Sequence, residues 1–420
     1  MRKEFVIKVV PEFCRLLLGV TFIFSGTVKA IDPEGTIIKM GDYFTAFAWR
    51  HAEWSDAVLS FVMIAFEFML GVCVLLGVYR RLSTLGILLF MAIMTPVTLY
   101  LALYNPVPDC GCFGDALIIT NWQTFYKNIV LSAAAIFAFI YCKRLTPCYS
   151  DRVHNFVALF SFTFCVGFCY WNYSHLPIVD FRPYKVGANI PQLMEIPANA
   201  PQDEYVFIYE KDGAQKEFKL EEAPAGDSAW TYIDARLVKP GFVPKVASFD
   251  LYNERGDNCA EKLFGKQKPV LLLISPHLEQ ASEAHIDRIE EVQEYAQAHG
   301  LSFYTVTASS ETQCREWTKR TGLNTPFLMA DDVLLRTIIR SNPGLVLMKQ
   351  GTILAKWHHN DIPAPDKLQT FIDTNKPSDR SAGRTPLYAI LAFVLPLLLL
   401  WGCDRPYKRK EKERVKNDQI

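Results

Sequence analysis

The sequence predicts a membrane protein that combines an all-α helical bundle with one α/β domain outside the membrane. Three observations support this fold class. Hydrophobic residues make up 50% of the 420 residues, and they are gathered into stretches long enough to cross a bilayer. Basic residues collect at alternate ends of these stretches. The long polar segment before the last stretch carries alternating strand and helix patterns.

Six stretches approach or reach the roughly 17–25 mostly apolar residues that a membrane-spanning helix needs. They are Pro11–Val28, Ala57–Val78, Leu82–Leu103, Phe125–Cys142, Val153–Trp171 and Pro386–Cys403. No small-x-small cleavage site follows the first stretch and the second comes soon after, so we expect the first to remain as a span. The first four stretches form a predicted four-helix core, to which two further spans are added.

Basic residues near the span ends predict the orientation. One face collects Arg2, Lys3, Arg80, Arg81, Lys143, Arg144 and the basic tail from Arg405 to Lys416. Because cytoplasmic ends of spans are enriched in Lys and Arg, this face is predicted to be cytoplasmic. We therefore expect a multi-pass protein of the inner membrane with both termini in the cytoplasm and the segment from Asn172 to Arg384 in the periplasm.

Composition excludes two other classes of protein. Lys+Arg and Asp+Glu balance at 44 each, so there is no basic field to hold nucleic acid. The 11 cysteines are scattered over spans, loops and the polar segment, unlike the dense disulfide framework of a small secreted domain. The predicted partners are the lipid bilayer and a periplasmic protein client or redox partner.

The polar segment begins with a proline-rich linker and a predicted hairpin. Tyr205–Tyr209 and Glu217–Leu220 flank Asp212-Gly213, a dipeptide that a type I′ turn favours. Further on, the strand Val270–Ile274, the helix Ala281–Ala298 and the strand Leu301–Thr307 predict a βαβ unit. A helix, a short strand, a short helix, a hairpin turned at Gln350-Gly351 and a last helix follow, at Glu311–Arg320, Pro326–Met329, Val333–Ile339, Leu345–Trp357 and Ala364–Ile372.

This succession resembles the thioredoxin fold, in which a cis proline precedes the hairpin, so we expect Pro343 to be cis. Thioredoxins carry Cys-x-x-Cys after the first buried strand. The corresponding segment Ser275–Ser282 reads SPHLEQAS and contains no thiol. The resemblance therefore implies a domain that binds or positions a partner. His277 and Glu279 are either a substitute acid–base pair or a polar helix cap. Cys259 and Cys314 are expected to be ordinary buried or half-buried thiols.

Five regions are predicted. They are the transmembrane four-helix domain at 1–145, the fifth span at 146–175, a linker with a small β subdomain at 176–240, the thioredoxin-like domain without a redox dithiol at 241–378, and the sixth span with its basic tail at 379–420.

The first third of the chain resembles the DoxX/MauE group of four-helix membrane proteins, as found fused to thioredoxin-like domains in Bacteroidetes. The resemblance rests on LGVTFIFSGTVKAIDP at Leu18–Pro33, EFMLG at Glu67–Gly71, LGVYRR at Leu76–Arg81, DCGCFGD at Asp109–Asp115 and TNWQTFYKN at Thr120–Asn128. The group is associated with maturation of methylamine dehydrogenase, which involves disulfides, and with thiosulfate:quinone oxidoreduction. It implies a redox or maturation role without fixing the reaction.

Cys110 and Cys112 are the leading catalytic candidates. They lie in a predicted outer loop, where disulfides persist, and Gly111 between them permits a tight turn. A strained disulfide there is easily reduced and suits an exchange site. The alternatives are a structural cap of the bundle or a metal site with Asp109 or Asp115, although no second ligand pair with zinc spacing follows. We predict no metal.

Glu67 is the third candidate because it is the only acid in the interior of a predicted span. A charge there is costly, so its side chain should face the bundle. A helix-to-helix hydrogen bond, with Ser25 or Thr95, is the structural alternative. Cys165 and Cys169 share one helix face but are spaced too widely to bond each other. They either reach the outer loop as relay partners or pack as small apolar residues.

Three functions remain open. The leading prediction is an accessory of envelope thiol–disulfide redox or protein maturation that uses Cys110 and Cys112. The second is a non-catalytic scaffold or assembly factor. The third is a quinone-linked oxidoreductase subunit or small-molecule transporter, supported by Glu67 alone; a quinone is the one cofactor that any of these readings calls for.

Overall fold

A computed structural model describes residues 2–49, 53–211, 213–224, 226–227, 229–239, 241–374, 376–377 and 384–417. In these ranges it has six helices long and apolar enough to cross a membrane, and this confirms the six predicted spans. The spans run over Val9–Ile31, Trp54–Leu76, Arg80–Tyr104, Asn121–Ile140, Asp151–Ser174 and Pro386–Arg409. The chain is thus a multi-pass membrane protein.

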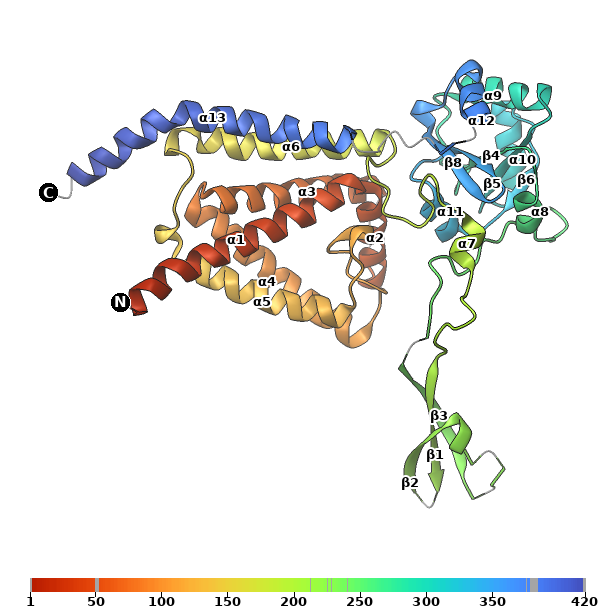
Figure 1. Ribbon diagram of the computed structural model, residues 1–420, viewed down its shortest axis with the longest axis horizontal. Coiled ribbons are helices and arrows are strands. Elements are labelled where there is room, and N and C mark those ends of the chain that lie inside the picture. Colours follow the sequence, from red (N-terminus) through yellow and green to blue (C-terminus); the bar gives the residue numbers. More distant parts are fainter. Residues whose placement is uncertain are drawn as a thin grey trace.

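Four of these helices form the core of the bundle, and two pack on its outside. The core consists of α1 (Arg2–Ile31), α3 (Glu53–Leu76), α4 (Arg80–Tyr104) and α5 (Asn121–Ile140). Helix α6 (His154–Ser174) packs against α3, and α13 (Arg384–Asn417) runs along α6. The short helix α2 (Pro33–Ala46) crosses the end of the bundle that faces the second domain, while both chain termini lie at the opposite end (Figure 1).

Glycines bring α1 and α3 into close contact. A Cβ atom added to Gly71 would lie 2.7 Å from the backbone nitrogen of Ile23, and one added to Gly26 would lie 2.9 Å from the Cα atom of Phe68. Small residues at helix crossings allow such close backbone approach in membranes, where packing and hydrogen bonds replace the hydrophobic driving force. This crossing places the end of α1 beside the middle of α3.

The second domain is built on a five-stranded sheet with the order β6-β5-β4-β7-β8. Its strands are β4 (Val270–Ile274), β5 (Ser302–Thr307), β6 (Phe327–Met329), β7 (Gly344–Lys349) and β8 (Thr352–His358). Strands β4, β5 and β6 are parallel, whereas β7 and β8 are antiparallel to their neighbours. The predicted βαβ unit and hairpin are therefore confirmed.

Apolar side chains cover both faces of this sheet. Leu272 and Val346 belong to one buried cluster, and Leu271 and Leu347 belong to the other, as the period of two along a strand requires. The helices are α8 (Ala260–Phe264), α9 (Ile286–Ala298), α10 (Glu311–Thr321), α11 (Asp332–Ile338) and α12 (Pro365–Thr374). The strand order, the helices on both faces and the cis peptide bond before Pro343 make the domain thioredoxin-like.

One predicted helix begins later than expected. Helix α9 begins at Ile286, with His285 before it, rather than at Ala281. The backbone N–H of Ser282 donates to the carbonyl oxygen of Asn342 at 2.9 Å, so this segment is bonded to the loop before Pro343 instead of to a helical turn. Residues 275–285 consequently form a loop over the end of β4.

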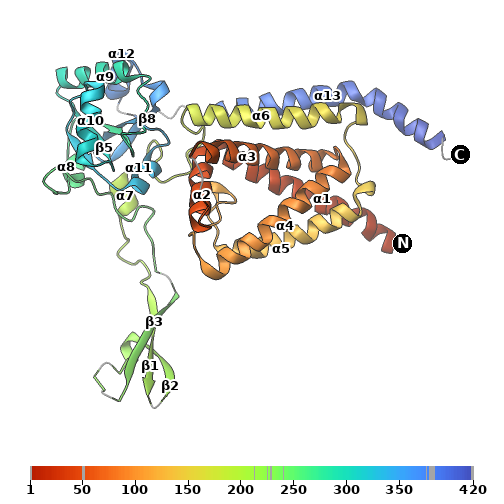
Figure 2. The same ribbon diagram turned by 180° about the vertical axis from the view of Figure 1, so that it is seen from behind.

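A three-stranded sheet projects from the rest of the molecule (Figures 1 and 2). It contains β1 (Glu204–Lys211), β2 (Ala214–Lys219) and β3 (Thr231–Lys239) in the order β2-β1-β3. The predicted hairpin is confirmed by the pairing of Lys211 with Ala214. Asp212 of the predicted turn lies outside the described residues. The prediction missed β3, whose alternation of apolar and charged residues is weak.

The remaining short elements connect these parts. They are the helix α7 (Ile190–Met194) and the 3-10 turns η1 (Gly114–Ala116), η2 (Cys142–Arg144), η3 (Asp151–Val153), η4 (Leu220–Glu222) and η5 (His359–Asp361).

Candidate functional site

The cysteine loop, residues 105–120 between α4 and α5, brings Cys110 and Cys112 together. Their Sγ atoms lie 2.8 Å apart and the two residues are free thiols. Gly111 between them has φ +66°, a conformation that L side chains rarely adopt, and its N–H donates to Asp109 Oδ1 at 2.8 Å. A disulfide bond measures about 2.05 Å, so a small movement of either side chain would close or open the pair.

Side chains from α1 and α2 hold the cysteine loop in place. Tyr43 donates its hydroxyl hydrogen to the Cys110 carbonyl oxygen at 2.7 Å, and Ser25 donates to the Cys112 carbonyl oxygen at 2.6 Å. Lys39 Nζ lies 2.9 Å from Asp109 Oδ2. These contacts fix both cysteines through the backbone of the loop and involve neither sulfur atom.

Glu67 is buried as predicted, but its expected hydrogen-bond partners were wrong. Lys29 Nζ lies 2.8 Å from Glu67 Oε2, and the two side chains are 7% and 5% exposed. Ser25 bonds Cys112 instead, and Thr95 bonds the Ser132 hydroxyl at 2.8 Å. The prediction that the first span ends at Val28, with Lys29 in the following loop, is wrong, because α1 continues through Lys29 to Ile31. One more helical turn therefore buries the lysine beside the acid.

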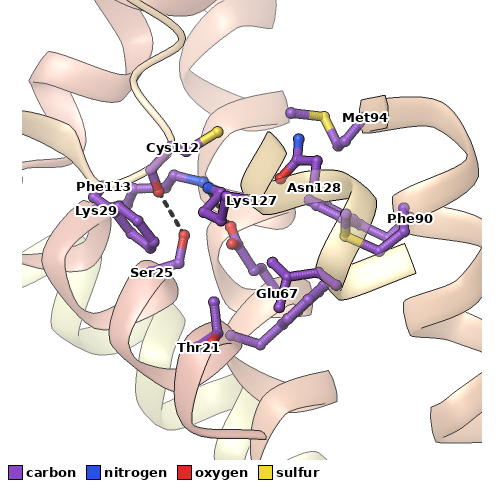
Figure 3. A pocket seen from close by; sticks show the side chains of 13 residues that line it. Thr21, Ser25, Lys29, Glu67, Phe90, Met94, Cys112, Phe113, Lys127 and Asn128 are labelled. Carbon is purple, nitrogen blue, oxygen red and sulfur yellow. Dashed lines mark hydrogen bonds and ion pairs between the residues drawn. The ribbon is translucent and has the colours of Figure 1, made fainter. Parts of the chain in front are cut away.

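A cavity of about 30 Å³ lies between this ion pair and Cys112. Figure 3 shows Glu67, Lys29, Lys127 and Asn128 around it, with Cys112 at its edge. The other lining residues are Thr21, Phe22, Ser25, Phe90, Met91, Met94, Phe113 and Leu131. Polar walls and this volume suit one or two water molecules, since a water needs roughly 10–15 Å³ and several polar partners.

The two thiols differ in acidity. The Cys110 thiol beside Cys112 lowers the pKa of Cys112 to about 6, and the charges of Lys127 and Lys29 act in the same direction against burial. The same sulfur contact, together with burial, raises the pKa of Cys110 well above its ordinary range. The lower pKa makes Cys112 the more ionised member of the pair at neutral pH, and a thiolate rather than a thiol is the nucleophile in exchange reactions.

The thioredoxin-like domain has no thiol where thioredoxins carry theirs. His277 Nε2 lies 3.1 Å from Asp332 Oδ1 and 2.9 Å from an Arg336 nitrogen, while its Nδ1 is 3.7 Å from Glu279 Oε1. The helix-cap explanation for these residues is wrong, because α9 begins at Ile286 and neither residue caps it. Charged residues of α11 hold His277 instead.

The remaining predicted cysteines are packing residues. Cys314 is buried and Cys259 is half-buried, as expected. Burial raises the pKa of Cys314 to about 11, which makes it a poor nucleophile. Cys165 and Cys169 are free and buried in the contact between α6 and α3, which confirms their packing role.

Within the described ranges, no three His, Cys, Asp or Glu side chains are grouped to hold a metal ion.

A second, larger cleft of about 380 Å³ lies between the two domains. From the membrane side it is lined by Glu34, Tyr173 and Ser174, and from the thioredoxin-like side by Pro276, His277, Gln280, Ser282, Arg336, Ile339, Ser341, Asn342, His358, His359 and Asn360. Burial lowers the pKa of His358 to about 3 and also lowers the pKa of His359, so both imidazoles are neutral at pH 7. The cleft is polar but carries little cationic charge.

Fold and site together define a class: a multi-pass membrane protein with a dithiol at one end of its helical bundle and a thioredoxin-like domain without a redox dithiol. Residues 7–141 match the family model described as methylamine utilisation protein MauE. Residues 203–239, which hold the projecting sheet, match a model described as a domain of unknown function, DUF8463. A comparison with curated proteins finds no match.

Among solved structures, the chain is similar to thioredoxin-like proteins over less than a third of its length. A secreted disulfide oxidoreductase of Mycobacterium tuberculosis, described as homologous to E. coli DsbE, is 18% identical, with 30% of this chain and 95% of that chain covered and a TM-score of 0.23. StoA from Bacillus subtilis is 12% identical over 29% and 94%, with a TM-score of 0.24. A thiol:disulfide interchange protein from Chlorobium tepidum is 14% identical over 30% and 91%, with a TM-score of 0.23. At these values the similarities carry no argument about activity.

Proposed function

We propose that this protein is an inner-membrane accessory of envelope thiol–disulfide exchange or protein maturation, and that Cys110 and Cys112 perform the exchange. The single observation behind the proposal is the 2.8 Å contact between the two sulfur atoms in a loop fixed by Ser25, Lys39 and Tyr43. A pair held this close alternates between dithiol and disulfide with little rearrangement.

The exchange uses the two cysteines in sequence. The Cys112 thiolate attacks a disulfide of the partner, forms a mixed disulfide and releases one partner thiolate, which takes up a proton. Cys110, after loss of its proton, attacks Cys112 Sγ and expels the second partner thiolate. The partner is reduced by two electrons and the Cys110–Cys112 pair is oxidised by two; the reverse sequence oxidises a partner dithiol.

The proposed orientation places this loop in the periplasm. The basic tail and the N-terminus lie at the opposite end of the bundle from the thioredoxin-like domain, and the bias of basic residues assigns that end to the cytoplasm. The client is then a periplasmic protein with a dithiol or a disulfide. Protease added to intact spheroplasts tests this assignment, because it should cut the domain and leave the tail intact.

Trapping of mixed disulfides tests the exchange itself. In Cys110→Ser the resolving thiol is missing, so Cys112 should accumulate in a mixed disulfide that non-reducing electrophoresis separates and mass spectrometry identifies. Cys112→Ser should trap far less, because Cys110 is buried and burial, which the substitution leaves in place, raises the pKa of its thiol. A Cys165→Ser, Cys169→Ser variant is the control, since both thiols are buried in α6. Absence of trapping in both single variants would refute the proposed exchange.

One observation favours a second function, that of a non-catalytic scaffold. The thioredoxin-like domain, about a third of the chain, carries no thiol in Ser275–Ser282, which favours a binding role for this domain. A scaffold would retain its partner when both loop cysteines are replaced. Copurification of the same partner by wild type and by the Cys110→Ser, Cys112→Ser variant, without any mixed disulfide, would favour this function.

A quinone-linked role has less support. The buried acid that suggested it is already paired with Lys29, and the cavity beside Cys112 has room for water but not for a quinone ring. Reoxidation of the reduced protein by added ubiquinone or menaquinone would nevertheless identify a quinone as the electron acceptor.

A further inference from the structure

Arg340 joins the thioredoxin-like domain to both segments that frame the dithiol. We propose that this domain is a cap on the protein's own cysteine loop, that Arg340 holds the cap closed, and that bulky partners reach Cys112 after this contact opens. The inference rests on the proposed function and adds its regulation: access to the dithiol is controlled by a domain of the same chain.

The contact is a cluster of three charged residues, in which Arg340 and Asp32 are buried and Asp115 is 37% exposed. Arg340 Nε lies 3.1 Å from both carboxylate oxygens of Asp32, and one of its terminal nitrogens lies 3.0 Å from Asp32 Oδ2 and 3.2 Å from Asp115 Oδ2. The side chains of Arg340 and Asp32 are each 9% exposed. A planar guanidinium that meets carboxylates at two edges is well suited to fix the orientation of the thioredoxin-like domain relative to the segments that carry Asp32 and Asp115.

Both acids are close in sequence to the reactive groups. Asp32 follows Lys29, the partner of Glu67, at the end of α1, and Asp115 follows Cys112 in the η1 turn of the cysteine loop. Arg340 thus connects the end of the span to the loop. Loss of the contact would free the η1 turn, whereas the bonds from Ser25 and Tyr43 would still hold the two cysteine carbonyls.

The local backbone is shaped for this contact. Gly35, in the first turn of α2, lies against the pair: a Cβ atom there would be 2.8 Å from Asp32 Oδ2 and 3.1 Å from an Arg340 terminal nitrogen. Asp32 in turn accepts the N–H of Gly35 at 3.0 Å. Only glycine leaves room for the guanidinium and the carboxylate at their present positions.

The part of the domain that is docked here lies next to its cis proline. Arg340 lies three residues before the cis Pro343, and the Asn342 carbonyl oxygen already accepts the Ser282 N–H. This part of the domain is therefore in contact with the membrane segment of the same chain. Figures 1 and 2 both place α11 at the side of the domain turned toward α2.

Alkylation with reagents of two sizes tests the cap. The reduced full-length protein in nanodiscs is treated with iodoacetamide or with a maleimide on a 5-kDa polyethylene glycol, and the label on Cys112 is followed by peptide mass spectrometry. We expect Arg340→Gln to raise the alkylation rate with the large reagent about tenfold, which is within the usual range for energetic coupling between two sites. The rate with the small reagent should change little. Asp115→Asn should act in the same direction.

Arg336→Gln is the matched control. Arg336 lies one turn earlier on α11 and pairs with Asp332 and His277 of its own domain. An equal rise in Arg336→Gln and Arg340→Gln, or an unchanged rate in Arg340→Gln, would overturn the cap. If Arg340→Gln fails to fold, Asp115→Asn and Arg340→Lys supply the same comparison. No partner protein takes part in the alkylation. The alkylation rates therefore test the cap alone, whereas trapping of mixed disulfides tests the proposed exchange.

Discussion

Lys29 and Glu67 form an ion pair of 2.8 Å inside the helical bundle, next to the cavity that borders Cys112. Either charge alone would be costly at this depth, and each makes the other tolerable. Of the two charges, that of Lys29 lowers the pKa of Cys112, whereas that of Glu67 acts in the opposite direction.

Removing one member of this pair should destabilise the protein strongly. We expect Lys29→Met to cost about 3–5 kcal/mol, because Glu67 is left as an unpaired buried charge. Thermal unfolding in detergent measures the loss. The Lys29→Met, Glu67→Leu variant should recover most of it, since apolar residues pack well in place of a buried ion pair. A double variant no more stable than Lys29→Met would contradict the pairing.

The alkylation rate of Cys112 should depend on pH as expected for a thiol with a pKa of about 6. Only the thiolate reacts, so the rate with iodoacetamide should rise between pH 5 and 7 and then level off. An ordinary cysteine, with a pKa of about 8.5, would still be gaining reactivity above pH 7. A profile with its midpoint above pH 8 would show that Cys112 is not activated.

Lys127 contributes to that activation through its charge. Its Nζ lies 4.2 Å from the centroid of the Phe113 ring and faces the same cavity as Cys112. Lys127→Met should move the midpoint of the alkylation profile to higher pH, because one of the charges that lower the Cys112 pKa is lost. Lys143→Met, in the η2 turn at the other end of the bundle, should leave the profile unchanged.

The close crossing of α1 and α3 predicts a packing defect at Gly71. Gly71→Ala places a methyl group 2.7 Å from the Ile23 backbone nitrogen, so the helices must separate. We expect a loss of about 1–3 kcal/mol, as for other overpacked interiors. Gly167→Ala is the comparison, because nothing lies within 4 Å of that position on α6. There, alanine should be neutral or stabilising. Equal melting temperatures for the two variants would argue against the tight crossing.

Asp180 should make stability sensitive to acid. Burial alone would raise its pKa, but the charges of Lys356 and Arg182 hold the pKa at about 2, below the ordinary 3.9 or so. Since the folded pKa is the lower one, its contribution of about 2.5 kcal/mol is present above pH 4 and disappears as pH falls toward 2. Asp180→Asn should remove this dependence. Asp287→Asn, at an exposed position of α9, is the control, because it leaves Asp180 and its two cationic partners in place.

Local sequence patterns determined most of the fold. Apolar length gave the six spans, and the run Val270–Ile274 with the following helix and strand gave the parallel part of the sheet, because burial and periodicity are properties of consecutive residues. The dipeptide Gln350-Gly351 predicted the turn of the hairpin for the same reason, because a tight turn requires positive φ at consecutive residues. The start of α9 was missed, since a hydrogen bond to Asn342, distant in the chain, overrides the helical pattern from Ala281.

The candidate site was predictable only in part. The sequence by itself determined that two cysteines and one glycine share a loop at the end of a span, and that one span carries an acid in its interior, because these facts follow from spacing and span length. Only the tertiary structure decided which charges meet: Lys29 with Glu67, Lys127 near Cys112, and Arg340 with Asp32 and Asp115. Coulomb attraction and burial depend on distance in space, and the packing of helices and domains sets that distance without leaving a periodic signal in the chain.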